Sequence, residues 1–264
     1  MRLAKIAKAS GVRRFVFSSS CSVYGAAGQE WIDEQSEPKP ITPYGVSKWN
    51  AEIELSQMAD GQFSPVFLRS ATAYGFSPRI RFDLVLNNLT AHAFTSGKVL
   101  LKSDGMSWRP IVHIEDIGRA FVAAIEAPVE TVHNETFNVG ITTENYRIRE
   151  IAQIVEETVP GSRVEFAAGA GPDKRTYRVD CSKISRLLPN FRPEWTARRG
   201  ARELYRSYSE HGLLLEDFEG ARYQRLAYLQ SLMARGVIDG SLRWILPAAN
   251  LESAGTAQHA KGVC

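Results

Sequence analysis

A tyrosine and a lysine four residues apart form the strongest chemical signal in the sequence, in the segment Tyr44-Gly45-Val46-Ser47-Lys48. On a helix, positions i and i+4 share one face, so the phenol and the ammonium can point into one site. A phenol titrates at about pH 10 and is a poor base at neutral pH, but a neighbouring ammonium favours the phenolate. Such a pair can take a proton from a hydroxyl while a hydride leaves the same carbon. A surface Tyr and Lys on an exposed helix is the alternative.

A serine cluster directly upstream supports the chemical interpretation. The apolar run Phe15-Val16-Phe17 predicts a short buried strand, and three serines, Ser18 to Ser20, follow it. A buried strand that ends in hydroxyls delivers them to the carboxyl edge of a parallel sheet, where such folds bind ligands. We therefore expect Ser20 to hydrogen-bond the oxygen that Tyr44 deprotonates. Without the Tyr–Lys pair, a turn or a helix cap would explain the serines better.

Short apolar strands alternate with amphipathic helices along the chain. We expect helices over 2–10, 44–59, 82–96, 115–127, 147–158, 182–188, 197–211 and 217–235, and strands over 13–18, 66–68, 99–101, 110–112, 136–139 and 164–166. This alternation predicts an α/β fold: a doubly wound, Rossmann-like parallel sheet with helices on both faces.

The predicted sheet carries the chemistry-bearing residues in the first part of the chain. We expect a partial Rossmann-like domain over 1–150, with segments of a second lobe interleaved at about 76–115. A smaller C-terminal substrate lobe with a helical extension is predicted over 151–246, and a disordered tail over 247–264.

Composition narrows the classes of partner. The 264 residues carry a net charge of +3 from 32 basic and 29 acidic side chains, a balance that indicates neither nucleic acid nor an anionic membrane. No apolar run approaches the ~20 residues of a membrane span. Three widely spaced cysteines form neither a disulfide framework nor a metal-ligand pattern, so we expect no metal and a reducing, cytoplasmic location.

The strand-Ser-Ser-Ser-x-x-Val-Tyr-Gly segment, followed by Pro-Tyr-Gly-x-Ser-Lys, resembles the active-site region of extended short-chain dehydrogenases. Within this group, the chain resembles the UDP-glucose 4-epimerase-like members of the NAD-dependent epimerase/dehydratase family. Further segments follow in family order: Leu68-Arg69 through Tyr74-Gly75, Asn87-Asn88-Leu89, Arg109 through Asp116, and Thr136 through Gly140. The ordered set, over about residues 2–205, is far more specific than any single motif.

The resemblance implies NAD as the cofactor and a nucleoside-diphosphate sugar as the substrate. By position, Ser20, Tyr44 and Lys48 match the catalytic residues of the family. The residues that match cofactor contacts are Ser18, Tyr44, Lys48 and Ala71, and those that match substrate contacts are Thr72, Asn88, Arg109, Asp173 and Arg175.

Two of these substrate residues have plain alternatives. A guanidinium suits bidentate contact with a diphosphate, and we favour that role for Arg109 over a surface arginine paired with Glu115 or Asp116. Asn88 either contacts the same diphosphate or caps a helix. The nearby His113 is interpreted as structural.

The two residues that follow Ser20 indicate the type of reaction. Dehydratases of this superfamily place an Asp-Glu pair there, as the acid and base that remove water, whereas this chain has Cys21 and Ser22. We therefore expect epimerisation through a transient keto intermediate, with a reductase or a dehydratase as the alternative. Thr72 stands where relatives often carry Asn. A short-chain dehydrogenase of the classical type, acting on steroids or simple alcohols, explains neither the long C-terminal part nor Arg109.

The sequence contains no G-x-G-x-x-G or G-x-x-G-x-x-G turn, which in such folds receives the pyrophosphate. The resemblance thus implies an N-terminally truncated chain that lacks its first β-α units and most of the cofactor site. A non-catalytic remnant that binds a sugar nucleotide or a partner is the alternative. The family also suggests a homodimer, formed by the first helix and the Tyr44 helix. The segment 213–244 lies beyond the usual family end, and we expect its helix to pack on the C-terminal lobe rather than bind a partner.

Overall fold

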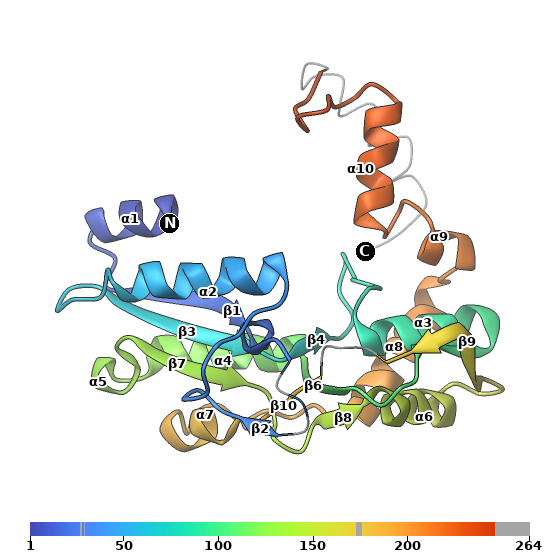
Figure 1. Cartoon of the computed structure of the whole chain (residues 1–264), viewed down its shortest axis with the longest axis horizontal. Coiled ribbons are helices and arrows are strands. Elements are labelled where there is room, and N and C mark those ends of the chain that lie inside the picture. The colour runs from blue at the N-terminus through green and yellow to red at the C-terminus, as the bar shows by residue number, and fades with distance from the viewer. Residues whose placement is uncertain (27, 29, 173–175, 246–264) are drawn as a thin grey trace.

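A parallel three-stranded sheet forms the first half of the structure, a computed structural model that describes residues 1–26, 28, 30–172 and 176–245. The strand order is β1 (Arg14–Ser20), β3 (Ser64–Ser70) and β7 (Glu135–Val139). Helices α1 (Arg2–Ala9) and α2 (Pro43–Ser56) lie above the sheet, and α4 (Ile114–Glu126) and α7 (Ser182–Leu187) lie below it (Figure 1). The prediction of a parallel α/β sheet covered on both faces is confirmed.

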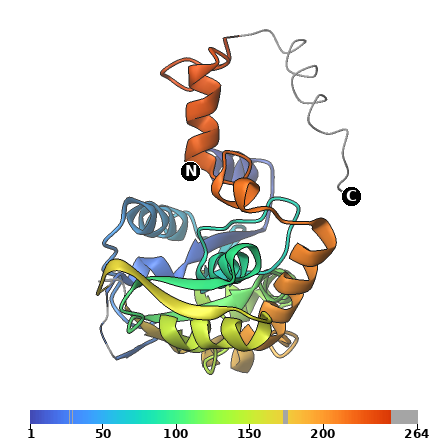
Figure 2. The same cartoon turned by 90° about the vertical axis from the view of Figure 1, so that its right-hand side faces the viewer.

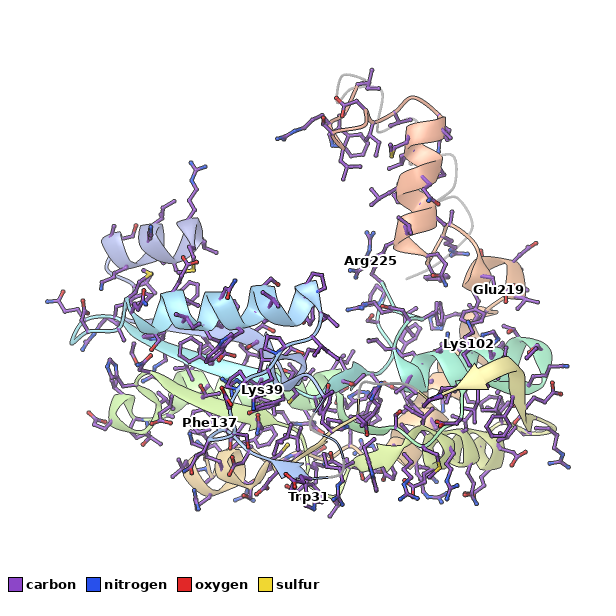
Figure 3. All side chains as sticks on the ribbon, in the orientation of Figure 1. Trp31, Lys39, Lys102, Phe137, Glu219 and Arg225 are labelled. Carbon is purple, nitrogen blue, oxygen red and sulfur yellow. The ribbon has the colours of Figure 1, made fainter. Side chains whose placement is uncertain are left out.

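The core strands are apolar because both of their faces are covered. Val66 and Leu68 of β3 and Phe137 of β7 are fully buried, and Phe137 lies inside the layered part of the molecule (Figure 3). The register aligns Ser20 of β1 with Ser70 of β3 at the carboxyl edge of the sheet. Side chains of consecutive strands therefore meet at one edge, as the serine cluster predicts.

A second group of elements adjoins this edge. Strand β6 (Trp108–His113) pairs in parallel with β4 (Thr72–Tyr74), and β5 (Lys98–Ser103) pairs in parallel with β9 (Arg163–Gly171). The remaining elements of this group are β8 (Asn145–Arg147), antiparallel to β6, and the helices α3 (Val85–Ser96), α6 (Ile148–Thr158) and α8 (Ala197–His211). Their apolar faces pack into one core cluster. The domain limits predicted from the sequence stay a prediction.

Short elements refine the expected loop over 21–42. The chain forms a 3-10 turn, η1 (Cys21–Tyr24), and a two-residue strand, β2 (Trp31–Ile32), which pairs with β10 (Arg178–Val179). A four-residue helix, α5 (Val129–Val132), precedes β7. Segments this short carry too few residues for a periodic signal, so the sequence did not predict them.

The helix predicted over 217–235 is wrong as a single element. It is two helices, α9 (Leu215–Glu219) and α10 (Arg225–Ala234), separated at Gly220, whose backbone is extended. A Cβ at Gly220 would lie 2.3 Å from the carbonyl oxygen of Glu216, so the close turn requires glycine.

The C-terminal extension packs on the lobe only through its first part. Phe218 and Tyr223 contact Phe82 edge-on, at 5.0 and 4.9 Å between ring centres. Beyond them α10 projects away from the body (Figure 2), and Leu226 and Met233 are 69% and 42% exposed. The expectation that this helix packs on the lobe is therefore wrong for α10.

The contact between α9 and α3 predicts a pH dependence of stability. Phe218 lies edge-on to the buried His92 at 4.6 Å, with Lys102 and Glu219 on the same part of the lobe (Figure 3). Burial lowers the pKa of His92, and the Lys102 ammonium lowers it further. The unfolded chain then binds a proton more readily, so stability is lost as the pH falls from about 6.5 through the lowered folded value.

We therefore expect His92→Gln to flatten the decrease in melting temperature between about pH 7 and pH 5, relative to the unsubstituted chain. Thermal melts across this range measure the effect. The exposed His133 is the matched control, and His133→Gln is expected to leave the slope unchanged. Equal slopes for the chain and for His92→Gln would contradict the assignment.

Candidate active site

Helix α2 presents Tyr44 and Lys48 at its N-terminal end, beside the carboxyl edge of the sheet. Thr42 caps the helix by accepting a hydrogen bond from the Gly45 N–H at 3.1 Å, and Pro43 occupies the first turn. The Lys48 ammonium donates to the Ser18 carbonyl oxygen at 2.7 Å and lies 5.7 Å from the centre of the Tyr44 ring. The structure thus brings the Tyr–Lys pair and the serine strand together.

Gly45 makes this approach possible. A Cβ at this position would lie 2.6 Å from the carbonyl oxygen of Ser22 and 3.0 Å from the Pro40 side chain. Any larger residue would push the start of α2 away from η1. The Gly of the Tyr-Gly-x-Ser-Lys segment therefore holds Tyr44 close to the segment that follows the serines.

Ser20 ends β1 and begins the 3-10 turn. Its Oγ accepts from the Ser22 N–H at 3.2 Å and donates to the Ser22 hydroxyl at 3.1 Å, so it also caps η1. Ser20 therefore caps a turn, which is the alternative given for the serines, and it does so at the end of β1, where the predicted substrate-binding serine lies. Tyr44 is 54% exposed. The convergence of Ser20 and Tyr44 on one sugar carbon stays a prediction.

The residues after β3 continue along this edge. The Ala71 N–H donates to the Val139 carbonyl oxygen at 3.0 Å, and Thr72, which is half-buried, begins β4. Ser70 Oγ is buried and has no hydrogen-bond partner among the residues described. Ser70 was not among the predicted site residues, although it aligns with Ser20 once β1 and β3 pair.

Asn88 does not cap a helix. It lies inside α3, whose N-cap is Leu84, and its side-chain amide donates to the Phe82 carbonyl oxygen at 2.7 Å. The capping alternative is therefore wrong, because the helix already begins at Val85, before Asn88. The amide instead ties α3 to the loop before it. A role in diphosphate binding stays a prediction.

Arg109 is an interior residue of β6, only 9% exposed, and donates to the Trp108 carbonyl oxygen at 2.8 Å. The alternative of a surface pair is wrong, because Glu115 and Asp116 bind a different arginine, Arg119, at 3.8 and 2.7 Å. Its predicted role with the diphosphate stays open to test. The substrate residues Asp173 and Arg175 lie outside the described residues.

His113 has a structural environment. It is 1% exposed, stacks on Trp195 at 3.7 Å between ring centres, and accepts the Glu115 N–H at the start of α4. Its Nε2 lies 3.0 Å from a Glu203 carboxylate oxygen. With both ring nitrogens engaged, the imidazole serves to join β6, α4 and α8.

A buried ion pair lies beneath the Tyr–Lys pair and was not predicted. Glu52 of α2 and Arg69 of β3 are each 3% exposed and meet at 2.6 Å. The available signal was spacing, because Glu52 follows Lys48 by four residues and so shares its helix face.

Parallel β-α architecture, hydroxyls at the carboxyl edge and a Tyr–Lys pair on the adjoining helix agree with the resemblance to short-chain dehydrogenases. That the Tyr–Lys pair forms a catalytic site stays a prediction. The chain belongs to the NAD dependent epimerase/dehydratase family, whose family model matches residues 1–140 of its 264 residues. The resemblance stated from the sequence is confirmed at this level.

Two similar proteins are named as a sugar-nucleotide epimerase and a sugar-nucleotide dehydratase. The chain is 29% identical over 213 residues to the UDP-glucose 4-epimerase of Bacillus subtilis, an alignment that covers 74% of this chain and 61% of that protein. It is 25% identical over 217 residues to the human dTDP-D-glucose 4,6-dehydratase, covering 79% and 60%. The chain thus spans about 60% of the length of these relatives.

A solved structure has the same fold. The UDP-glucuronic acid 4-epimerase of Bacillus cereus, crystallised with UDP-glucuronic acid and NAD, is 27% identical and superposes with a TM-score of 0.68. The superposition covers 80% of this chain and 66% of that structure. Among the helices of the described residues, none has both the length and the apolar composition of a membrane span.

Proposed function

We propose that this chain belongs to an enzyme that epimerises a nucleoside-diphosphate sugar with NAD(H), through a transient keto intermediate. One observation carries the proposal: the Lys48 ammonium lies 2.7 Å from the Ser18 carbonyl oxygen and 5.7 Å from the centre of the Tyr44 ring, at the edge where β1 ends in hydroxyls. Relatives named as 4-epimerases of UDP-sugars support the type of reaction.

The residues present fit the nicotinamide–ribose end of NAD. The unpartnered buried hydroxyl of Ser70 and the hydroxyl of Ser20 face the same strand edge, and Lys48 and Ala71 adjoin it. A ribose and a carboxamide offer the donors and acceptors that such groups need. When bound, the cofactor accepts a hydride from the sugar and returns it. We propose Ser18, Tyr44, Lys48 and Ala71 as its contacts.

Each residue of the site then has a distinct task. Tyr44 takes the proton of the sugar hydroxyl at the carbon that is oxidised, and returns it when the keto group is reduced. Lys48 stabilises the phenolate, while its hydrogen bond to Ser18 keeps the ammonium in place. Ser20 donates to the reacting oxygen and holds it within reach. Inversion requires the keto sugar to turn its other face between the two transfers.

Elimination is disfavoured by the residue after Ser20. The Cys21 side chain is 1% exposed and donates to the Arg69 carbonyl oxygen at 3.1 Å. Burial raises the pKa of the Cys21 thiol well above its ordinary value, so it stays neutral and turned away from the edge. A dehydratase needs an acid and a base at this position and the next. The geometry therefore supports epimerisation over dehydration.

Buried free thiols at Cys21 and Cys181 support a reducing, cytoplasmic location.

The test is to purify the chain, release and quantify bound NAD, and assay UDP-, GDP-, CDP- and dTDP-sugars for epimer formation. A parallel sample is supplied with NAD. Interconversion of one sugar pair without net change in NADH is the expected result. Loss of water from the sugar would support the dehydratase instead. Binding of a sugar nucleotide with neither NAD binding nor turnover would favour the non-catalytic alternative.

Arg109 provides a separate prediction about the substrate. If its guanidinium binds the diphosphate, Arg109→Lys is expected to weaken UDP binding by about 10- to 100-fold, because an ammonium cannot make the paired contacts of a guanidinium. Isothermal titration with UDP measures the change. The exposed Arg206 on α8 is the control, and Arg206→Lys is expected to leave UDP affinity as it is. Unchanged affinity in Arg109→Lys would remove Arg109 from the substrate site.

We also propose a homodimer formed through α1 and α2. Two apolar residues of α2 face outward: Val46 and Ile53 are 41% and 38% exposed, while Glu52 and Leu55 are buried. Leu3 and Ile6 of α1 are 71% and 54% exposed. An apolar surface on two adjacent helices is typical of an interface.

Light scattering after gel filtration is expected to give twice the chain mass, and the double variant Leu3→Asp/Ile53→Asp is expected to give the chain mass. The matched control is Leu226→Asp/Leu229→Asp on α10, which changes an apolar helix face outside the proposed interface. A monomeric unsubstituted chain would contradict the dimer.

A further inference from the structure

The buried charges beneath the Tyr–Lys pair form a closed network. Arg69 donates from Nε to the Glu52 carboxylate at 3.0 Å and from a terminal nitrogen at 2.6 Å, while its other terminal nitrogen donates to the Tyr24 hydroxyl at 2.9 Å. Ser19 donates to the same Glu52 carboxylate. The Tyr24 hydroxyl in turn donates to Asn138 at 2.7 Å. Every charged group in the network is thus paired within the interior.

The network lies one residue before the candidate active site on the three strands, and about one helical turn beyond Lys48 on α2. Ser19, Arg69 and Asn138 occupy one row across β1, β3 and β7, directly before the row that contains Ser20 and Ser70. On α2, Glu52 follows Lys48 by four residues and Tyr44 by eight. Since i, i+4 and i+8 share a helix face, Glu52 extends the Tyr–Lys face along the helix.

Helix α2 is therefore tied to β1 at two adjacent points. Lys48 donates to the Ser18 carbonyl oxygen at 2.7 Å, and Glu52 accepts from the Ser19 hydroxyl. Two contacts one turn apart on one face define both the rotation of a helix and its position along its axis. The Arg69 guanidinium also lies 5.6 Å from the ring centre of Trp49 on the same helix.

A buried ion pair holds two elements together only after both charged groups have lost their hydration. Its desolvation offsets most of its attraction, and an apolar pair of similar volume often stabilises a fold as well. A carboxylate bound by a guanidinium fork differs from an apolar contact in geometry, because it accepts one orientation rather than many. The pair is therefore suited to define where α2 sits.

We propose that Glu52 and Arg69 are positioning residues, which set the rotation of α2 so that Tyr44 and Lys48 face the carboxyl edge of the sheet. The expected effect on kcat rests on the proposed function. The expected effect on the position of Lys48 does not depend on it. Neither residue touches the substrate, because both side chains lie inside the protein below the edge.

The test is the triple variant Ser19→Ala/Glu52→Met/Arg69→Met, which replaces the network's charges and the Ser19 donor by apolar groups of similar size. Its melting temperature is expected to remain close to that of the unsubstituted chain. Its kcat is expected to fall by about 100-fold, the typical cost of misplacing a catalytic group by about 1 Å, while KM for the sugar nucleotide stays within about threefold.

A second readout needs no turnover. Acetylation of lysines by an N-hydroxysuccinimide ester, followed by mass spectrometry, reports whether the Lys48 ammonium is still held by Ser18. We expect Lys48 to react several-fold faster in the triple variant, with the exposed Lys5 of α1 unchanged as the internal reference. If the unsubstituted protein proves inactive, the proposed function fails and this labelling still decides the positioning role.

Matched variants separate positioning from general damage. Arg119→Met breaks a pair with the buried Asp116 far from α2, and is expected to change neither kcat nor Lys48 labelling. Should the triple variant fail to fold, Glu52→Gln and Arg69→Lys, which preserve size or charge, take its place with the same two readouts and smaller expected effects. Unchanged kcat and unchanged Lys48 labelling in the folded variants would overturn the proposal.

Discussion

Replacing Tyr44 with Phe is expected to lower kcat for epimerisation by about 10²- to 10⁴-fold, with little change in KM. The substitution removes only the hydroxyl that would take the sugar proton, and the ring remains beside Lys48. The Tyr44 side chain is 54% exposed, so its loss of one oxygen should leave folding intact. The effect is measured from initial rates over a range of sugar-nucleotide concentrations, with the enzyme supplied with NAD.

The control for this substitution is Tyr228 on α10, which is 44% exposed and lies outside the site. Tyr228→Phe is expected to retain full activity. Equal rates for the unsubstituted enzyme and Tyr44→Phe would show that another group removes the proton, and the Tyr–Lys assignment would then be wrong.

Replacing Arg69 with Met is expected to lower the free energy of unfolding by about 3–5 kcal/mol. The Glu52 carboxylate is 3% exposed and accepts charge-assisted hydrogen bonds from Arg69 at 2.6 and 3.0 Å. Without the guanidinium, an ionised carboxylate stays buried with only the Ser19 hydroxyl as a described donor. Urea denaturation followed by circular dichroism measures the loss as a lower midpoint with an unchanged slope.

Arg119→Met provides the comparison. Arg119 is one-third exposed, and the buried Asp116 retains backbone donors from Glu194 and Trp195 at 3.0 Å each. The expected loss is therefore only about 1 kcal/mol or less. If both substitutions lower the free energy of unfolding by the same amount, the Glu52–Arg69 pair would contribute no more to stability than the partly exposed Arg119–Asp116 pair.

The sequence alone determined the elements and most of their order. The apolar run Val66–Leu68 forms a core strand, since both faces of the central strand of a parallel sheet are buried. The run Phe15–Phe17 also forms a strand, but β1 is at the edge of the sheet and these residues are half-buried rather than buried as predicted. The ends of two predicted helices agree with the structure. Pro43 lies in the first turn of α2, and Gly97, at φ 71°, follows the last residue of α3, because caps depend on neighbours in the chain.

Part of the candidate site followed from the sequence in the same way. The spacing of Tyr44 and Lys48 places both on one helix face, and the serines that end β1 reach the sheet edge. Both inferences use only periodicities of 3.6 and 2. The family resemblance rested on an order of motifs along the chain, and the match of the family model over residues 1–140 confirms the family.

Only the tertiary structure decided what covers each face. In α2, the spacing of apolar residues did not separate the exposed Val46 and Ile53 from Leu55, which is buried with Glu52 against the sheet. The sequence also did not show that α10 projects from the body (Figure 2), because periodicity marks an apolar helix face without identifying what covers it.

Pairs distant in sequence also depend on the assembled sheet. Glu52 and Arg69 meet because α2 lies on β1 and β3 in one register, and Ser70 joins Ser20 by the same register. Arg109 was expected at a ligand, and its burial within β6 is a property of the packed lobe. Local periodicity carries no information on register between strands, since register is set by contacts that form only when the chain has folded.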